Sequence, residues 1–231
     1  ARSGSPVMTS PAHLVVIPDG NRRFARMHGW PIEDGYAAGS RKGVELVDWC
    51  IAASVAHLSV FAASTENVAR RPAADLIAMF RALASFCAAA SARRGVALHT
   101  VGDVDALPHA LPGRDELRRL AAPSPGPARL VVHIAANYSS EGDLAPLVAA
   151  AAGPLRAAAT AAPLRYLRSR EVPRADLVIR TGGQRRLSGL FPHQCAHADL
   201  WFTDTLWPVF SEGEFATALE WYGLQERLHG E

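Results

Sequence analysis

The chain has 231 residues, 49% of them hydrophobic and 20% charged, and a formal net charge of +2. This composition is typical of a globular protein with a buried core. The balanced charge gives no indication of nucleic-acid binding, and no uninterrupted apolar run of about 18 residues predicts a membrane span.

The size of the chain favours one domain. Residues 1–12 are expected to lie outside it, because the first seven look like a cloning remnant before a native start near Met8. A single domain is expected over residues 13–231. Three widely spaced cysteines, Cys50, Cys87 and Cys195, favour reduced, mostly buried thiols in a cytoplasmic protein.

The first predicted element is an apolar strand, Leu14–Ile17, which ends at Pro18. The five residues that follow the proline bring one carboxylate, one glycine, one amide and two guanidinium groups: Asp19, Gly20, Asn21, Arg22 and Arg23. This order predicts a turn and a helix start, whose unpaired N–H groups can hold an anion. Arginines suit phosphate oxygens, whereas Asp19 would repel a bare phosphate.

A Mg²⁺ ion held by one carboxylate and by substrate phosphates reconciles Asp19 with the arginines. The segment therefore predicts a magnesium-diphosphate site. An ordinary Asx turn with a helix cap is the alternative interpretation of the same tripeptide.

Apolar, β-branched runs alternate with helical spacing through the rest of the chain. The strands are expected at Leu14–Ile17, Leu58–Ala62, Val96–Val101, Leu130–Ala135 and Leu177–Ile179, and the helical segments at Gly43–Ala53, Ala74–Ala90 and Leu144–Ala159. This alternation predicts an α/β fold with a mostly parallel central sheet flanked by helices. Ligands in such folds bind beyond the carboxyl ends of the strands. Four polar segments follow strands and are expected to converge there: Asp19–Arg23, Ser64–Arg71, Asn137–Ser140 and Arg180–Ser188.

The second of these segments offers hydroxyl and amide donors and two cations to a second phosphate. These groups belong to Ser64, Asn67, Arg70 and Arg71. A capping box at the start of a helix is an equally good interpretation of Ser64 and Asn67.

The last polar segment carries an arginine at the end of an apolar strand, Arg180, which is costly unless paired. Two glycines, Gly182 and Gly183, allow a close backbone approach to a ligand, and Arg186 and Ser188 add phosphate donors. A charged surface loop is the alternative interpretation of this segment.

Asp199 is either an ordinary polar position or a second magnesium ligand. No P-loop, dinucleotide or Gly-x-Ser-x-Gly pattern occurs.

Together these segments resemble the cis-prenyltransferase, or undecaprenyl diphosphate synthase, family from His13 to about Gly230. The matching motifs are Pro18–Ala25, Gly35–Gly39, Ser64–Asn67, Val101–Asp103, Asn137-Tyr138, Asp176–Gly183 and Trp201–Pro208. The resemblance implies a homodimeric catalytic domain with a hydrophobic tunnel beside the sheet, prenyl diphosphate substrates and Mg²⁺. It implies that Asp19 carries the metal and that Asp199 stands where the family has a metal-assisting glutamate.

The resemblance also assigns the substrate groups. Gly20, Asn21 and Arg23 would bind the allylic diphosphate, and Arg180, Arg186 and Ser188 the second diphosphate. Ser64 and Asn67 match positions around the reacting groups, so the predicted catalytic residues are Asp19, Asn21, Ser64 and Asn67. Further substrate contacts are expected from Arg22, Tyr36, Arg70, Arg71, Met79 and Phe80.

Several departures from the family pattern distinguish this chain. Tyr36 replaces the usual histidine, Gln184 replaces a glutamate, and Leu228-His229-Gly230 replaces a C-terminal Arg-x-Gly. Asp34–Ala38 and Phe191-Pro192 resemble the lavandulyl-type branch, which couples allylic diphosphates head-to-middle. We therefore expect dimethylallyl diphosphate to react with a second allylic diphosphate, dimethylallyl or geranyl.

Two alternatives remain at this point: a regular head-to-tail short-chain synthase that uses isopentenyl diphosphate, and a non-catalytic partner subunit. A short product is expected if bulky residues close the tunnel floor, and Met79, Phe80, Leu83 and Phe86 are candidates. Their helical spacing also fits plain core residues.

Overall fold

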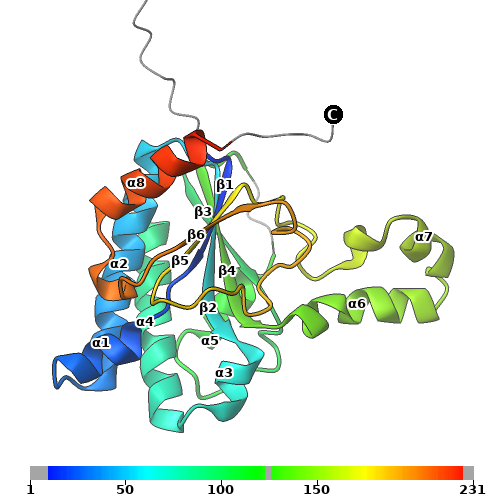
Figure 1. Cartoon of the computed structure of the whole chain (residues 1–231). Helices are drawn as coiled ribbons and strands as arrows, with labels where there is room; N and C mark the ends of the chain where they lie inside the picture. The colour runs from blue at the N-terminus through cyan, green and yellow to red at the C-terminus, as the bar shows by residue number, and fades with distance from the viewer. Residues whose placement is uncertain (1–9, 123–125, 226–231) are drawn as a thin grey trace, which may run out of the picture.

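A six-stranded parallel sheet forms the centre of the molecule (Figure 1). The computed structural model describes residues 10–122 and 126–225, and its strand order is β3-β4-β2-β1-β5-β6. The strands are β1 (His13–Ile17), β2 (His57–Ser64), β3 (Val96–Val101), β4 (Leu130–Tyr138), β5 (Leu177–Arg180) and β6 (Asp199–Phe202). The predicted α/β fold is confirmed, and all five expected strands are present. The sixth, β6, was missed because its four residues begin with an acid that we interpreted as a possible metal ligand.

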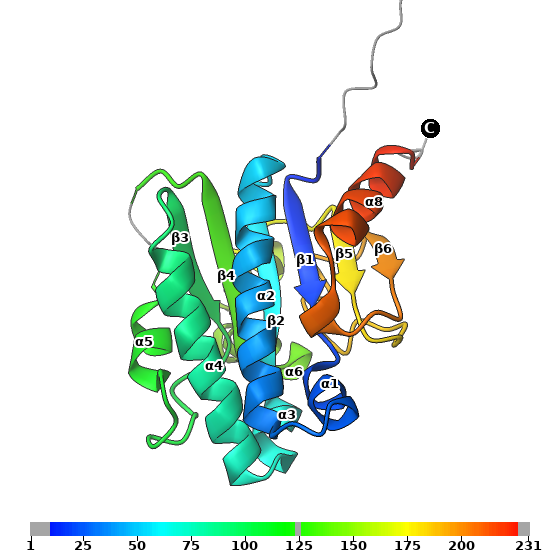
Figure 2. The same ribbon diagram turned by 90° about the vertical axis from the view of Figure 1, so that its left-hand side faces the viewer.

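Helices cover one face of the sheet, where α2 and α4 pack side by side and α8 lies over the β1–β5 half (Figure 2). The helices are α1 (Asn21–Met27), α2 (Ile32–Ala52), α3 (Thr65–Arg70), α4 (Ala73–Ser91), α5 (Arg114–Arg119), α6 (Ser140–Ala152), α7 (Arg156–Ala161) and α8 (Glu212–Gly223), with short 3₁₀ turns η1 (Pro163–Tyr166) and η2 (Trp207–Val209). The main core lies between these helices and the sheet, and includes the buried side chains of Leu14, Leu58, Leu46 and Phe80.

The opposite face of the sheet is covered mainly by irregular chain. Val15, Ile17 and Val178 point to this side and pack with Leu190 and Phe191. Successive strand residues alternate between the two faces, so the neighbouring strands β1 and β5 are buried on both sides, as is typical of a parallel sheet.

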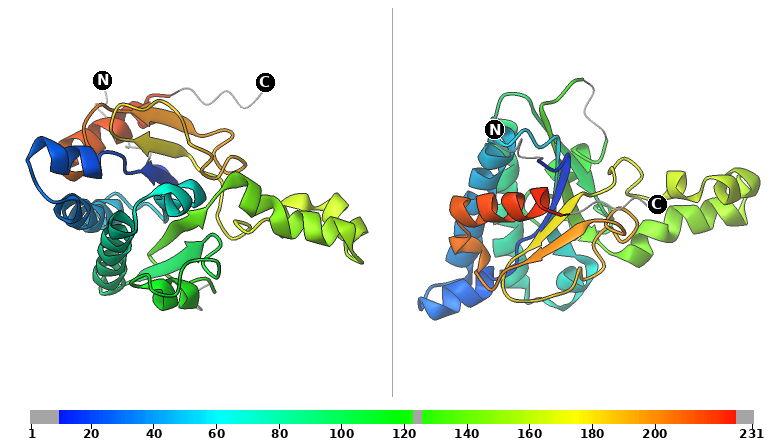
Figure 3. Two further views of the ribbon diagram at one scale, coloured as in Figure 1. Left: turned by 90° about the horizontal axis from the view of Figure 1, so that it is seen from below. Right: turned by 45° about the horizontal axis from the view of Figure 1, so that its top comes forward.

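The alanine-rich segment expected at Leu144–Ala159 is broken into two helices. Gly153 follows α6 in extended backbone, and the chain turns back into α7. The two helices form an arm that projects from the body (Figures 1 and 3). Buried Asp143 ties the arm to the sheet by accepting hydrogen bonds from Tyr138 Oη at 2.9 Å and Ser169 N at 2.7 Å.

One helix in the described part of the chain, α4, is long and apolar enough to span a membrane. In this fold it packs against α2, and its side chains Leu76, Phe80 and Cys87 are buried in the core. The three cysteines are free and buried, as expected, and burial raises the pKa of the Cys87 and Cys195 thiols to about 12. Residues 1–9 of the predicted N-terminal extension and the Leu228–Gly230 departure lie outside the described residues.

Four histidines from four neighbouring strands meet on the face opposite α2. His99 Nδ1 lies 3.1 Å from His133 Nδ1, and His133 Nε2 lies 3.1 Å from His57 Nδ1. His13 Nε2 lies 2.8 Å from Ser59 Oγ. Burial lowers the pKa of His133 from 6.5 to about 2 and that of His13 to about 4, so both rings are neutral in the folded protein at pH 7.

These histidines make the stability of the fold depend on pH. An unfolded chain binds protons at the ordinary histidine pKa of 6.5, whereas folded His13 stays neutral down to about pH 4 and His133 further still. Stability is therefore full above pH 6.5 and falls as the pH drops below it, by about 1.4 kcal/mol per pH unit for each such histidine. Urea unfolding between pH 7.5 and 4.5 measures this slope.

His133→Asn removes one of the neutral rings, so its unfolding should take up about one proton fewer at low pH. We therefore expect the free energy of unfolding of this variant to fall less steeply with decreasing pH than that of the wild type. The exposed His109 provides the control, since His109→Asn should keep the wild-type slope. An unchanged slope in His133→Asn would contradict the assignment.

Candidate active site

A cavity of about 540 Å³ opens at the carboxyl end of the sheet, between β1, β2, α2 and α4. Three of the four predicted polar segments line it, and the first and last come from the adjacent strands β1 and β5. The fourth segment, Asn137–Ser140, does not reach it. Asn137, Tyr138 and Ser139 instead line a separate cavity of about 150 Å³ with Thr65.

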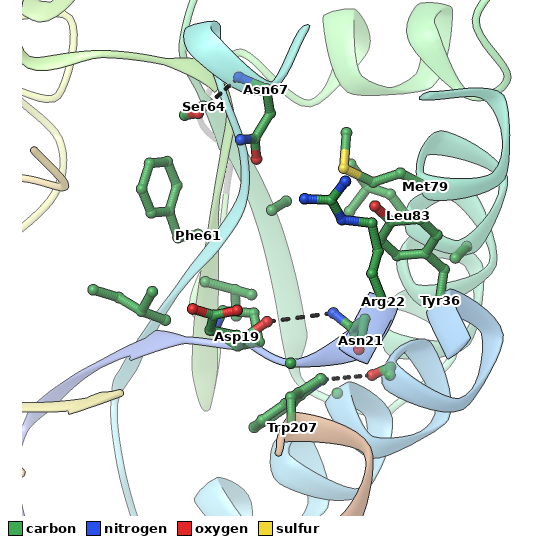
Figure 4. A pocket seen from close by; sticks show the side chains of 18 of the residues that line it. Asp19, Asn21, Arg22, Tyr36, Phe61, Ser64, Asn67, Met79, Leu83 and Trp207 are labelled. Atoms are coloured by element: carbon green, nitrogen blue, oxygen red, sulfur yellow. Dashed lines mark hydrogen bonds between the residues drawn. The ribbon is translucent and has the colours of Figure 1, made fainter. Parts of the chain in front are cut away.

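Asp19 lines the cavity and lies near Asn21 (Figure 4). The register pairs Ile17 of β1 with Arg180 of β5, which brings Asp19 next to the arginine. Its Oδ2 accepts a hydrogen bond from Arg180 Nη2 at 3.2 Å, and its Oδ1 lies 3.3 Å from Arg23 Nη2. One carboxylate therefore sits between two guanidinium groups.

The backbone around Asp19 is held from two directions. Asp19 O accepts from Thr181 Oγ1 at 2.8 Å and from the Trp207 N–H at 3.0 Å. The next residue, Gly20, has φ +124°, and a Cβ there would lie 2.9 Å from Leu206 Cβ. Only glycine fits this turn without strain.

The Arg180 side chain organises the second phosphate segment. It is 4% exposed, and its Nη1 donates to Ser188 Oγ at 2.8 Å and to the carbonyl of Arg186. Burial lowers the pKa of Arg180, and its hydrogen bond to Asp19 opposes the shift. Its buried Nε has no hydrogen-bond partner in the described structure. A buried cation with an unused donor is suited to an incoming anion.

A second guanidinium, that of Arg71, lines the cavity on the side of α4. Its Nη2 donates to Asn67 Oδ1 at 2.9 Å, and its Nη1 donates to Tyr36 Oη and contacts Met79 Sδ at 3.1 Å. Burial lowers the pKa of Arg71 and raises that of Tyr36, so the phenol stays protonated. Because Tyr36 accepts from Arg71, its own O–H is available to a ligand.

Ser64 has the capping role that we considered as an alternative. Its Oγ accepts from the Asn67 backbone N–H at 3.0 Å. The cap leaves the Asn67 side chain facing Arg71, and both residues line the cavity. Figure 4 shows Ser64 and Asn67 across the cavity from Asn21 and Trp207.

Part of the cavity wall is apolar. This part is formed by Val60 and Ala62 of β2 and by Met79, Leu83 and Phe86 of α4. Phe80, which we expected to contact substrate, does not line the cavity and is fully buried in the core. It follows Met79 directly, so it is turned about 100° round the helix.

Two other predicted residues lie away from the cavity. Arg70 is exposed and pairs with Glu66 at 2.8 Å. Asp199 begins β6 and pairs in register with Leu177, at the opposite end of the sheet from Asp19. Asp199 therefore does not lie next to Asp19 within this chain, because Asp199 is the first residue of β6 and the carboxyl end of the strand is three residues further on.

The cavity also contains residues that we did not predict as site residues, among them Arg26, Gly39, Gly43 and Trp207. Arg26 follows Arg22 by four positions, so their shared helix face was visible in the sequence. Gly39 and Gly43 have the same spacing on α2. A Cβ at Gly39 would lie 2.0 Å from Asn21 Oδ1, and one at Gly43 would lie 3.1 Å from Phe86 Cδ2. Trp207 is positioned by tertiary contacts alone.

The charges of the cavity fit a magnesium-diphosphate ligand. Six arginines line it, against two carboxylates: Arg22, Arg23, Arg26, Arg71, Arg180 and Arg186, with Asp19 and Glu66. Within the described residues, no group of three or more acidic, histidine or cysteine side chains could hold a metal alone. Asp19 fits a Mg²⁺ ion that takes its remaining ligands from phosphate and water.

An α/β fold with a cavity lined by six arginines and by apolar side chains suits an amphiphilic anionic ligand. The undecaprenyl diphosphate synthase family model of prenyltransferases matches residues 17–230. The chain belongs to this family and is a prenyltransferase.

Curated relatives cover most of the chain. A short-chain Z-isoprenyl diphosphate synthase of Mycobacterium leprae is 36% identical over 234 residues, which cover 95% of this chain and 88% of that protein. A ditrans,polycis-undecaprenyl-diphosphate synthase of Xanthomonas oryzae is 35% identical, with 97% and 90% covered. A (2Z,6E)-farnesyl diphosphate synthase of Mycobacterium tuberculosis is 33% identical, with 95% and 88% covered.

Among solved structures, the fold is similar to that of lavandulyl diphosphate synthase from Lavandula x intermedia in complex with dimethylallyl diphosphate. The TM-score is 0.85 at 22% identity, with 96% of this chain and 99% of that chain covered. At this identity the likeness shows the fold alone.

Gly39 provides a test of the site geometry. Gly39→Ala would place a Cβ against Asn21 Oδ1 and 3.0 Å from Trp207 Cδ1, so Asn21 must move. We expect the affinity for inorganic diphosphate with Mg²⁺ to fall by up to about 10²-fold, as small misplacements in a site can cause. Titration calorimetry measures the dissociation constant.

Gly213→Ala is the matched control, because Gly213 is exposed in the first turn of α8 and the nearest atom to its added Cβ would be Ser211 Oγ at 3.8 Å. This variant should keep diphosphate binding and gain up to about 1 kcal/mol of stability. Equal binding by both variants would show that Asn21 need not stay in place.

Proposed function

We propose that the protein is a short-chain prenyl diphosphate synthase that joins dimethylallyl diphosphate to a second small isoprenoid diphosphate. The observation that carries the proposal is the cavity itself, whose lining combines six arginines with apolar side chains of β2 and α4. Its volume of about 540 Å³ is in the range that encloses a drug-sized ligand. Such a space suits small isoprenoid substrates and a short product.

The allylic diphosphate would lie against the Asp19 turn. Gly20, Asn21 and Arg23 line the cavity there. Arg71 donates to the Tyr36 hydroxyl and contacts Met79 of the apolar wall. The second diphosphate would lie at Arg180, Arg186 and Ser188. Arg180 touches both positions through its contacts with Asp19 and Ser188.

Bound Mg²⁺ would supply charge neutralisation for the departing diphosphate. The chain's own arginines stabilise the negative charge that grows on this group as the allylic C–O bond breaks. Met79, Leu83 and Phe86 exclude water from the positive charge left on the carbon chain. The double bond of the second substrate then forms the new C–C bond, and a proton leaves.

For the second substrate we propose another allylic diphosphate, which gives head-to-middle coupling. The altered second site supports this choice, since Gln184 stands where the family has a glutamate and is hydrogen-bonded to Arg186 Nη1 at 2.6 Å. The regular alternative, head-to-tail coupling to isopentenyl diphosphate, is favoured by the names of the Mycobacterium relatives.

A homodimer is part of the proposal, and cytoplasmic location stays an expectation. The arm exposes Val148, Leu155 and Leu164, and β6 is an edge strand with Leu200 exposed. Apolar side chains gathered on a projecting arm favour a protein contact. The Asp19 cluster argues against a non-catalytic partner subunit, because such a subunit has no need to keep paired charges in a cavity.

Purified enzyme with Mg²⁺ and dimethylallyl diphosphate alone tests the coupling mode. We expect a branched product, identified by mass spectrometry and NMR, without added isopentenyl diphosphate. Asp19→Asn serves as the inactive reference, with turnover lower by about 10²-fold or more if Asp19 holds the metal. Product that forms only with isopentenyl diphosphate would establish the regular alternative, and full activity of Asp19→Asn would refute the metal assignment.

Phe86 is expected to limit product length. Phe86→Ala enlarges the apolar end of the cavity, so longer products should appear when wild-type and variant are supplied with the same substrates. Phe80→Ala is the matched control from the same helix. It should keep the product length and lose about 3–5 kcal/mol of stability, as buried phenylalanines do. Longer products from Phe80→Ala alone would reverse this assignment.

A further inference from the structure

The segment Thr203–Trp207, the bridging segment, contacts both halves of the diphosphate site. Gly182 N–H donates to Thr205 O at 2.8 Å, and Gly183 N–H donates to Thr203 O at 2.9 Å. At its other end, Trp207 N–H donates to Asp19 O at 3.0 Å. One stretch of chain therefore sets the position of the Asp19 turn relative to the Gly182-Gly183 loop.

The loop depends on these contacts more than an ordinary loop would. Gly182 and Gly183 have φ of +79° and +76°, and a pair of glycines has little conformational preference of its own. Gly182 O in turn accepts from Arg23 Nη2 at 2.6 Å. The conformation of Gly182 therefore determines where Arg23 lies beside Asp19.

The bridging segment is held from outside the cavity by Glu214, in the first turn of α8. Glu214 Oε1 accepts from Thr205 Oγ1 at 2.5 Å and from Thr203 Oγ1 at 3.3 Å. Glu214 Oε2 accepts from Ser211 N at 3.1 Å and completes a capping box. The two carboxylate oxygens thus have different partners: Oε1 binds the bridging segment, and Oε2 binds the helix cap.

We propose that Thr205 is a positioning residue for the diphosphate site, acting through Glu214 and Gly182 on Arg23. Neither Thr205 nor Glu214 lines the cavity. The inference rests on the proposed function only in that the ligand is a diphosphate. The alternative is that the Thr205–Glu214 contact merely attaches α8, in which case it contributes to stability and not to binding.

Three variants separate these roles. Thr205→Val keeps the shape of the side chain and removes the hydrogen bond to Glu214. Thr205→Ser keeps the hydroxyl. Ser211→Ala breaks the helix cap on the other side of Glu214 and leaves the Thr205 contact in place. All are made in the full chain, and urea unfolding is measured for each.

The probe is inorganic diphosphate with Mg²⁺, followed by titration calorimetry. We expect Thr205→Val to raise the dissociation constant about tenfold, Thr205→Ser to restore binding, and Ser211→Ala to lower stability with unchanged binding. Equal effects of Thr205→Val and Ser211→Ala on binding, or no effect of Thr205→Val, would overturn the proposal. Should Thr205→Val fail to fold, Thr203→Val removes the 3.3 Å contact to the same oxygen and the hydrogen bond that Thr203 Oγ1 accepts from Thr205 N at 3.2 Å, and it is expected to weaken binding as well.

A double-mutant cycle with Arg23→Ala tests the route. If Thr205 acts through Arg23, Thr205→Val has no further effect on diphosphate binding in the Arg23→Ala background. If the losses of diphosphate affinity from the two substitutions are additive, Thr205 does not act through Arg23, and this route is rejected. These binding data are independent of turnover, so an enzyme that turns over no prenyl diphosphate would refute the proposed function and leave this test intact.

Discussion

The carboxylate of Asp19, held between the guanidinium groups of Arg23 and Arg180, is the interaction on which the site depends. Its two oxygens face different cations at 3.3 and 3.2 Å. The sheet makes this possible, because β1 and β5 are adjacent and Ile17 is paired with Arg180. A buried arginine at a strand end is costly without a partner, and Asp19 supplies that partner.

Support for this arrangement comes from backbone groups. Asp19 O accepts two hydrogen bonds, from Thr181 and Trp207, and Gly182 O accepts one from Arg23. Each is worth about 1 kcal/mol net, so no single contact holds the turn. Preorganisation of charged groups by such contacts lowers the cost of reorganisation when the leaving group develops its charge.

The sequence indicated the local parts of this structure well. Strand, turn and helix start around Asp19 follow one another along the chain, as do Arg180 and the two glycines, and a parallel sheet brings such segments to one edge. The sequence did not show which face of α4 meets the cavity. Met79, Leu83 and Phe86 share one helix face and Phe80 lies beside it, but periodicity does not say which face meets a cavity and which meets the core.

Other features depend on contacts between distant residues. Trp207 donates its indole N–H to Gly39 O at 2.8 Å, across 168 positions of sequence. The histidine cluster forms only when four strands pair in register. The residues around each histidine in the sequence give no sign that the four would meet. Asp199 was assigned a role by resemblance, and only the strand order shows that it lies at the far end of β6.

The excess of positive charge in the cavity links binding to the state of the free protein. Six arginines and two carboxylates lie within one cavity, and burial lowers the pKa of both Arg71 and Arg180. In the proposed reaction, a bound diphosphate would offset the repulsion among these guanidinium groups, so part of the free energy of substrate binding would come from charges that the fold already holds together. The same charges would favour cleavage of the C–O bond and slow release of the product diphosphate.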